Sequence, residues 1–233
     1  MAGTLRIFST LAVQGAMPVV SEGYDRLAGT KLAVEFAPTN GLMARIESGE
    51  RADVAILTRE GADQLAVRGL LRGDSVVDVA RSYVGIAVRA GAAKPDISSP
   101  QALKAALLGA KSIAYSRIGA SGILFARLIA QLGIEKEVNA KATVIPSGFT
   151  AELVAREEVE LAVQQVSELM VVAGTDVVGP LPIELQEPAM FSAGVFVESA
   201  EPEQSARFVQ FLTSAAAAPA LQAAGLEPVA TQR

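Results

Sequence analysis

Segments with the pattern of a β-strand alternate with segments of helical period along almost the whole chain. In the first part of the sequence, three short strand-like runs each precede a segment whose apolar residues recur at helical spacing. The strand-like runs are 5–8, 31–36 and 53–57, and the helical segments are 16–27, 41–48 and 59–68. This strand–helix–strand order predicts an α/β fold in which parallel strands carry helices on their faces.

The same alternation continues to the end of the chain. Further strands are predicted at 81–89, 112–115, 142–145, 160–164 and 191–197, and further helices at 94–108, 121–132, 150–156, 203–213 and 219–224. The order of these elements predicts two Rossmann-like lobes. Lobe I is expected to comprise 1–80 and 194–233, and lobe II to comprise 81–193, including two crossover segments at 81–90 and 185–193. Paired crossovers predict a hinge.

Composition excludes several classes of protein. The 233 residues carry a formal net charge of -5 without a block of Lys and Arg, which argues against binding to a nucleic-acid backbone. Cysteine and histidine are absent, which excludes disulfides, thiolate nucleophiles, Cys/His zinc sites and a Ser-His triad. We therefore expect no metal and no cofactor. No apolar run reaches about 18 residues, so we expect no insertion into a membrane.

Four predicted strand-to-helix junctions are rich in small, hydroxyl-bearing and amide residues. Their candidate ligand-binding residues are Ser9 and Thr10; Thr39 and Asn40; Ala120, Ser121 and Gly122; and Ser147 and Gly148. A helix start favours an anion, because its N–H groups are unsatisfied and the helix dipole is positive there. Plain N-capping explains any single junction better, but the four together predict a shared anion-binding cleft. Ser121 and Gly122 are the strongest candidates, because glycine lets the backbone approach a ligand closely.

Two glutamines and three arginines are further candidates. Gln164 and Gln165 end an apolar strand, where one side chain must face inward or toward a cleft. A ligand contact and a solvated strand end bonded to a loop are both open for this pair. An arginine fork would suit a carboxylate ligand, and Arg81, Arg89 and Arg117 lie near the predicted cleft or hinge. Arg117 is favoured because it lies inside the loop of small residues.

Seven stretches of the chain stand in the order and spacing of a known family. They are RIFSTLAVQGAM (6–17), VEFAPTNGLMARIESGERADVAIL (34–57), SIAYSRIGASGILFARLIAQLGI (112–134), ELAVQQVSEL (160–169), VGPLPIELQ (178–186), FSAGVFV (191–197) and FLTSAAAAPALQAAGLEP (211–228). The chain resembles the molybdate-binding-protein-like branch of the type II periplasmic solute-binding proteins, which serve ABC importers. The resemblance implies two α/β lobes joined by two crossover strands, with a small anion clamped between them. It implies a receptor for an ABC importer or a related sensor.

The ligand positions of that family differ in this chain. A serine is expected near Ala12, paired serines where Thr39 and Asn40 stand, and a tyrosine near Gln165. Because these positions hold the oxyanion in molybdate binders, the differences predict another ligand, such as an organic carboxylate.

An isomerase acting on a small tricarboxylate is the alternative function, because aconitate isomerase is similar to the same branch. Such a reaction needs a positioned acid or base, and Tyr115 is the nearest candidate to a predicted binding loop. The partners expected are a small anionic ligand and a membrane subunit of an ABC transporter, and the chain is expected to be a monomer. Residues 1–8 lack the pattern of a signal peptide. The location expected is periplasmic if a signal peptide was removed, and cytoplasmic otherwise.

Overall fold

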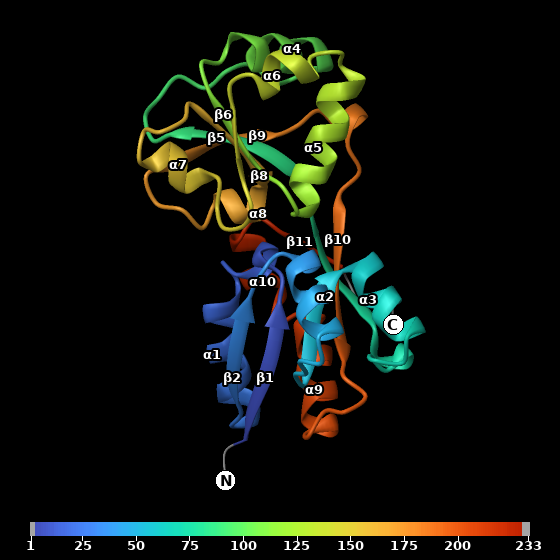
Figure 1. Ribbon diagram of the computed structural model, residues 1–233. Coiled ribbons are helices and arrows are strands. Elements are labelled where there is room, and N and C mark those ends of the chain that lie inside the picture. Colours follow the sequence, from blue (N-terminus) through green and yellow to red (C-terminus); the bar gives the residue numbers. More distant parts are fainter. Residues whose placement is uncertain (1–2, 230–233) are drawn as a thin grey trace. The chain divides into compact units, whose positions relative to one another are not determined.

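The computed structural model describes residues 3–229, and the chain divides into two compact units (Figure 1). Within these residues, unit 1 comprises 3–81 and 189–229, and unit 2 comprises 82–188. Each unit is built on one β-sheet covered by helices. The structure confirms the predicted α/β class.

Unit 1 contains a six-stranded sheet in the order β11-β4-β10-β3-β1-β2. Its strands are β1 (Thr4–Ser9), β2 (Lys31–Phe36), β3 (Val54–Thr58), β4 (Val77–Ser82), β10 (Ala189–Val195) and β11 (Glu227–Pro228). Its helices are α1 (Met17–Ala28), α2 (Thr39–Glu47), α3 (Arg59–Val67), α9 (Pro202–Leu212) and α10 (Ala218–Ala223), with short 3-10 turns at Leu11–Val13 and Gly73–Ser75. β1 pairs in parallel with β2 and β3, whereas β10 runs antiparallel to β3.

The central strands of unit 1 alternate between two hydrophobic cores. Ile7 and Ile56 face the core formed with α1, α9 and α10, whereas Phe8 and Leu57 face the core formed with α2 and α3. Successive side chains of a strand point to opposite faces of a sheet, so strands covered on both faces are apolar throughout. This is why 54–57 appears in the sequence as a continuous apolar run.

Unit 2 contains a five-stranded sheet in the order β7-β6-β8-β5-β9. Its strands are β5 (Val84–Arg89), β6 (Ile113–Ser116), β7 (Ala142–Ile145), β8 (Leu161–Gln165) and β9 (Thr175–Pro180). Its helices are α4 (Pro100–Gly109), α5 (Ala120–Gln131), α6 (Glu135–Asn139), α7 (Ala151–Ala155) and α8 (Val166–Leu169), with a 3-10 turn at Ile183–Leu185. β6 lies parallel to both β7 and β8, so the carboxyl ends of these three strands lie at one edge of the sheet.

Two crossover predictions were wrong in detail. The single strand predicted at 81–89 is two strands, because β4 ends at Ser82 in the sheet of unit 1 and β5 begins at Val84 in the sheet of unit 2. An uninterrupted apolar pattern does not show that a chain changes sheets. The second crossover was expected to reach residue 193, but β10 begins at Ala189 and pairs with β3. The predictions also omitted α6, α8, β9 and β11.

Candidate functional site

The start of α5 in unit 2 is the best-formed candidate for holding an anion. β6 ends at Ser116, and the chain reaches α5 through the extended N-cap residue Gly119. The N-cap residue Gly119 supplies no side-chain cap, and the first turn of the helix contains no acidic residue. Its first N–H groups and the positive end of its dipole therefore lie next to the end of β6. Such a helix start binds an anion without a cationic side chain.

Two glycines let α5 begin directly above the end of β6. A Cβ atom at Gly122 would lie 1.8 Å from the carbonyl oxygen of Ser116, and one at Gly119 would lie 2.7 Å from the Ser116 Oγ. Ser121 is 2% exposed, and the buried Oγ of Ser116 has no hydrogen-bond partner among the described residues. Ser116 was not among the predicted site residues, and its burial could not be read from the sequence.

The loop after β7 is held by a buried glutamine. Ser147 is exposed, and Gly148 has a φ of 90°, in the region that favours glycine. The Oε1 of Gln164 accepts from the backbone N of Thr150 at 2.8 Å and from its Oγ1 at 3.0 Å. The Nε2 of Gln164 donates to the carbonyl oxygen of Gly148 at 3.0 Å. Gln164 is therefore a buried tie to this loop and not a solvated strand end.

The neighbouring glutamine contacts the segment that enters unit 2. Gln165 is 2% exposed. In the orientation that satisfies its amide, its nitrogen donates to the carbonyl oxygens of Ser82 and Tyr83 at 3.1 and 3.2 Å. The N–H of Val166 also donates to the Tyr83 carbonyl oxygen, at 2.8 Å. The end of β8 is thus fixed to the start of β5.

A buried carboxyl group lies one turn beyond these glutamines. Glu168 in α8 is 7% exposed. Burial raises the pKa of its carboxyl group to about 7, although hydrogen bonds from the backbone of Gln165 and the side chain of Gln164 act in the opposite direction. Sequence reasoning missed this residue, because a glutamate at the end of an amphipathic segment is usually exposed.

The predicted site residues of unit 2 lie at one edge of its sheet. Because β6 is parallel to β7 and β8, the loop holding Arg117, the start of α5 at Ala120, and the loop holding Ser147 follow neighbouring strand ends. Arg117 is exposed, and its backbone N–H donates to the carbonyl oxygen of Ile145 at 2.8 Å. Gln165 ends the third of these strands.

The first junction of unit 1 differs from the expected geometry. Ser9 and Thr10 are buried, but the chain continues into the 3-10 turn Leu11–Val13, and α1 begins only at Met17. The Oγ of Ser9 donates to the carbonyl oxygen of Thr10 at 3.2 Å. The Ala12 side chain is fully buried in the core with α1. These residues thus precede a 3-10 helix. The α-helix predicted at 16–27 begins at Met17, so Ser9 and Thr10 do not lie at its start.

The second junction of unit 1 does open an α-helix. Thr39 and Asn40 are the first two residues of α2. The Oγ1 of Thr39 accepts from the backbone N of Thr58 at 3.1 Å, which ties α2 to the end of β3. Asn40 is exposed. Because β1 is parallel to β2, Thr39 and Thr10 follow adjacent strand ends at the same edge of the sheet.

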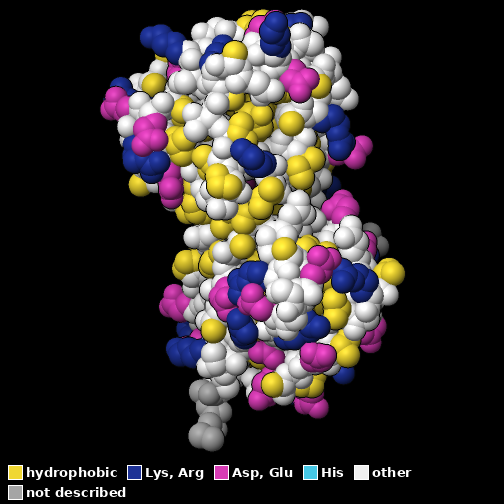
Figure 2. Space-filling view, viewed as in Figure 1, with side chains coloured by type: hydrophobic (Ala, Val, Ile, Leu, Met, Phe, Trp, Pro, Cys, Tyr) yellow, Lys and Arg dark blue, Asp and Glu magenta, His cyan; other side chains and the backbone are white. Residues whose placement is uncertain are grey.

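Most arginines of the molecule are neutralised by carboxylates. Arg81 pairs with Glu227 at 3.5 Å and Arg89 with Glu157 at 3.2 Å, so neither is an uncommitted anion ligand. Figure 2 shows Lys and Arg interspersed with Asp and Glu over the face in view. This pattern gives an anion site little long-range attraction, so short-range donors must supply the affinity.

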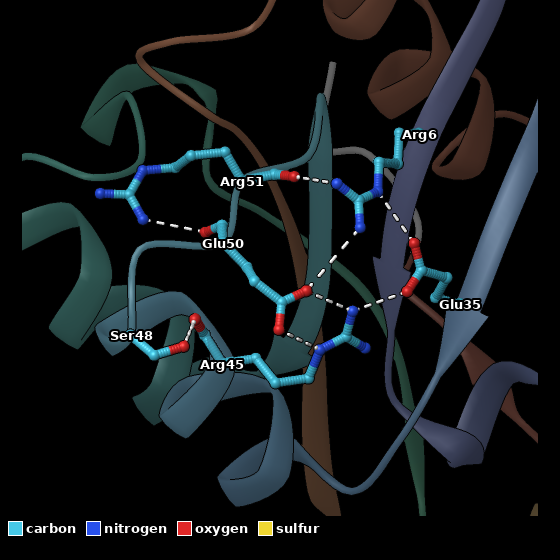
Figure 3. Close-up of polar contacts among 6 residues, drawn as sticks. All are labelled: Arg6, Glu35, Arg45, Ser48, Glu50 and Arg51. Carbon is cyan, nitrogen blue, oxygen red and sulfur yellow. Dashed lines mark hydrogen bonds and ion pairs between the residues drawn. The ribbon is translucent and has the colours of Figure 1, made fainter.

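A charged network near the start of β1 illustrates this neutralisation (Figure 3). Arg45 donates to Glu35 and Glu50 at 2.6 Å each, and Arg6 donates to Glu35 at 2.8 Å. These hydrogen bonds, chiefly those from Arg45, lower the pKa of both carboxyl groups. The guanidinium carbons of Arg6 and Arg45 lie 4.9 and 4.5 Å from the ring centroid of Phe8. The network fixes α2 to β1 and β2 and is a structural feature.

Tyr115 does not have the position expected of an acid or base in a binding loop. Its hydroxyl donates to the Oδ1 of Asn139 at 2.8 Å, and its ring packs on Phe125 with centroids 5.2 Å apart. It belongs to the core with α4, α5 and α6, and burial raises the pKa of its hydroxyl. In β6 the side chains of Tyr115 and Ser116 point to opposite faces of the sheet. Ser116, and not Tyr115, therefore lies next to the start of α5.

The described residues contain neither a metal cluster nor a membrane span. Among 3–229, no three acidic side chains are grouped so that they could hold a metal ion. Within the same residues, no helix combines the length and apolar character needed to cross a bilayer.

Two α/β units linked by two chain crossings, with polar loops at the carboxyl ends of parallel strands, define the type II periplasmic binding protein fold. Residues 5–227 match the model of the bacterial extracellular solute-binding proteins, and the chain belongs to this family.

Several relatives agree with this assignment. The chain is 36% identical to an aconitate isomerase of Pseudomonas sp. over 98% of its own length and 89% of that protein. The periplasmic molybdate-binding protein of Azotobacter vinelandii superposes with a TM-score of 0.81 at 18% identity, over 98% of this chain and 100% of that one. The sulfate-binding protein of Mycobacterium tuberculosis gives a TM-score of 0.80 at 16% identity, over 97% and 87% of the two chains. At these identities the two structures show the fold alone.

Proposed function

We propose that this chain is a binding protein for a small anion, either an oxyanion or an organic carboxylate. The observation that carries the proposal is the uncapped start of α5, where glycines at 119 and 122 bring backbone N–H groups to the end of β6. Ser121 and the loop at Ser147 and Gly148 follow the same sheet edge and supply further donors. The relatives named for molybdate and sulfate support an anion as the ligand.

The proposal also assigns ligand contacts to residues of unit 1. Ser9 and Thr10 follow β1, and Thr39 and Asn40 open α2 at the same sheet edge. Their hydroxyl and amide groups are neutral donors, as are those of unit 2. An organic carboxylate is favoured over molybdate. The resemblance to molybdate binders implies a serine at position 39 and a tyrosine near position 165, where this chain has Thr39 and Gln165.

The test is a thermal-shift and calorimetric screen of molybdate, sulfate, phosphate, citrate, cis-aconitate and trans-aconitate. A ligand that binds only the folded protein raises the melting temperature at saturating concentration. Ser121→Ala removes a hydroxyl at the start of α5 and is expected to weaken the best ligand about tenfold. Ser48→Ala, which removes an exposed hydroxyl at the end of α2, is the control. Absence of any shift across all six anions would reject the proposal.

Isomerisation of a tricarboxylate is a second candidate function. The relative at 36% identity is named an aconitate isomerase, and the chain matches it over 98% of its length. Moving a proton between carbon atoms requires an acid or base with a pKa near the working pH, and the Glu168 carboxyl group has a pKa of about 7. Proton NMR of the protein with cis- or trans-aconitate in D2O measures interconversion of the two isomers and so distinguishes catalysis from binding alone. Interconversion above a heat-inactivated control supports catalysis, and tight binding without conversion supports the receptor alone.

We also propose an extracytoplasmic location and a membrane subunit of an ABC transporter as the partner, as the family implies. Cell fractionation tests the location, and light scattering after size exclusion tests the expectation that the chain is a monomer.

A further inference from the structure

Glu168 is a buried carboxyl group without an ion pair among the described residues. It is 7% exposed and is the third residue of α8. Hydrogen bonds from the backbone N–H of Gln165, the N-cap residue, and from the side chain of Gln164 reach it. The first of these is the contact that a glutamate makes in a capping box. The capping contact explains the position of the side chain, but it does not require that the group be buried.

One side chain separates Glu168 from the ligand loop after β7. The amide of Gln164 contacts Glu168 and also holds Gly148 and Thr150 by hydrogen bonds of 2.8 to 3.0 Å. A negative charge on Glu168 therefore lies within roughly 8 Å of the Thr150 backbone N, the span of one glutamine and two hydrogen bonds. Because that N–H already binds Gln164, an anion held by the neighbouring N–H groups of the loop lies further away, at about 10 Å. At that distance in a protein interior, two like charges repel appreciably.

Within the part of the chain that the structure describes, no charged side chain is paired with this carboxyl group. α8 packs against β5, β8 and β9, and β8 contains no ionisable side chain. Arg89, at the end of β5, is exposed and paired with Glu157, and Asp176 in β9 accepts from the N–H of Gly91. The charge of Glu168 is thus not compensated locally.

We propose that binding of an anion by unit 2 is coupled to uptake of a proton by Glu168, so that affinity rises as the pH falls through neutrality. The inference rests on the proposed binding function and adds to it a dependence on protons. It follows from the repulsion between the bound anion and the buried carboxylate, which protonation removes.

The pKa of about 7 places this protonation in the accessible range. By linkage, an anion that binds the protonated form more tightly must raise the pKa of the carboxyl group when it binds. With unit charges about 10 Å apart and an effective dielectric constant of about 20, the protonated form binds roughly 15-fold more tightly. Because the group is partly protonated in the free protein, affinity is expected to fall roughly sixfold from pH 6 to pH 8.

The test measures binding of trans-aconitate and molybdate by calorimetry from pH 6 to pH 8. The wild type, Glu168→Gln and Glu160→Gln are compared, so that titration of the probe itself affects all three equally. Glu168→Gln keeps the side-chain shape and removes the charge. Glu160→Gln, just before β8, removes an exposed carboxylate at the opposite end of that strand. Glu168→Gln is expected to bind both anions tightly at all pH values. The affinity of the wild type and of the Glu160→Gln control is expected to fall toward pH 8.

A second measurement uses the wild type alone and does not depend on the folding of a variant. Calorimetry at pH 7.5 in buffers of different ionisation enthalpy is expected to show uptake of about half a proton or more per anion bound. Binding without proton uptake, or parallel pH profiles in the wild type and Glu168→Gln, would overturn the coupling and leave the binding function intact. Failure of both probes to bind the wild type at every pH would overturn the binding function and the inference together.

Discussion

Gly122 tests whether the close contact between α5 and β6 is required. In Gly122→Ala the new Cβ would lie 1.8 Å from the carbonyl oxygen and 2.7 Å from the Oγ of Ser116. Cβ atoms rarely approach other heavy atoms within about 3.0 Å, so the start of α5 must move away by more than about 1 Å. The backbone oxygen of a buried strand has little freedom to yield.

The expected loss of stability is the balance of two opposed effects. Replacement of a helical glycine by alanine gains roughly 0.5–1 kcal/mol in helix propensity. Overpacking of this kind costs about 1–3 kcal/mol or more, and the contact with backbone places it at the upper end. We expect Gly122→Ala to lower the free energy of unfolding by about 2 kcal/mol. The displaced N–H groups are expected to weaken anion binding at least about tenfold.

Gly109→Ala is the matched control for this change. Gly109 is the last residue of α4, and a Cβ atom there would meet nothing within 4 Å. The same substitution should therefore leave binding unchanged and raise stability by up to about 1 kcal/mol. Denaturant unfolding of both variants and calorimetry with the best anion measure the outcome. If Gly122→Ala matches Gly109→Ala in both measurements, the reasoning about the α5 start is refuted.

Three other predictions concern stability. Glu168→Gln should become more stable relative to the wild type, by roughly 3 kcal/mol in all, as the pH rises from about 4.5 to 7. The reason is that the pKa of the buried carboxyl group is about 7 in the folded protein, against an ordinary 4.5. Unfolding midpoints of both proteins at pH 5 and pH 8 check this, and a constant difference between them would contradict it. Glu157→Gly should stabilise the protein by about 0.5–1 kcal/mol, because Glu157, which follows α7, has a φ of 61°, a conformation that favours glycine. Thermal unfolding measures this change. Ser99→Ala should cost about 1 kcal/mol in the same assay, because the Ser99 Oγ accepts the N–H of Ala102 at the start of α4.

The sequence by itself determined the class of fold and the order of its elements. Alternating apolar patterns at 31–36 and helical spacing at 59–68 are local signals, and they gave β2 and α3 correctly. The small residues between 116 and 122 likewise marked the start of α5, because glycine and serine at a helix start reflect local backbone geometry.

Tertiary structure alone decided which side chains are buried and paired. Tyr115 and Ser116 are adjacent in sequence, but one belongs to the core and the other lies under α5. The change of sheet at Tyr83 and the burial of Glu168 depend on strands far apart in the chain. Such properties arise from contacts that local sequence does not encode, since a carboxyl group acquires a raised pKa only when the remainder of the unit removes it from water.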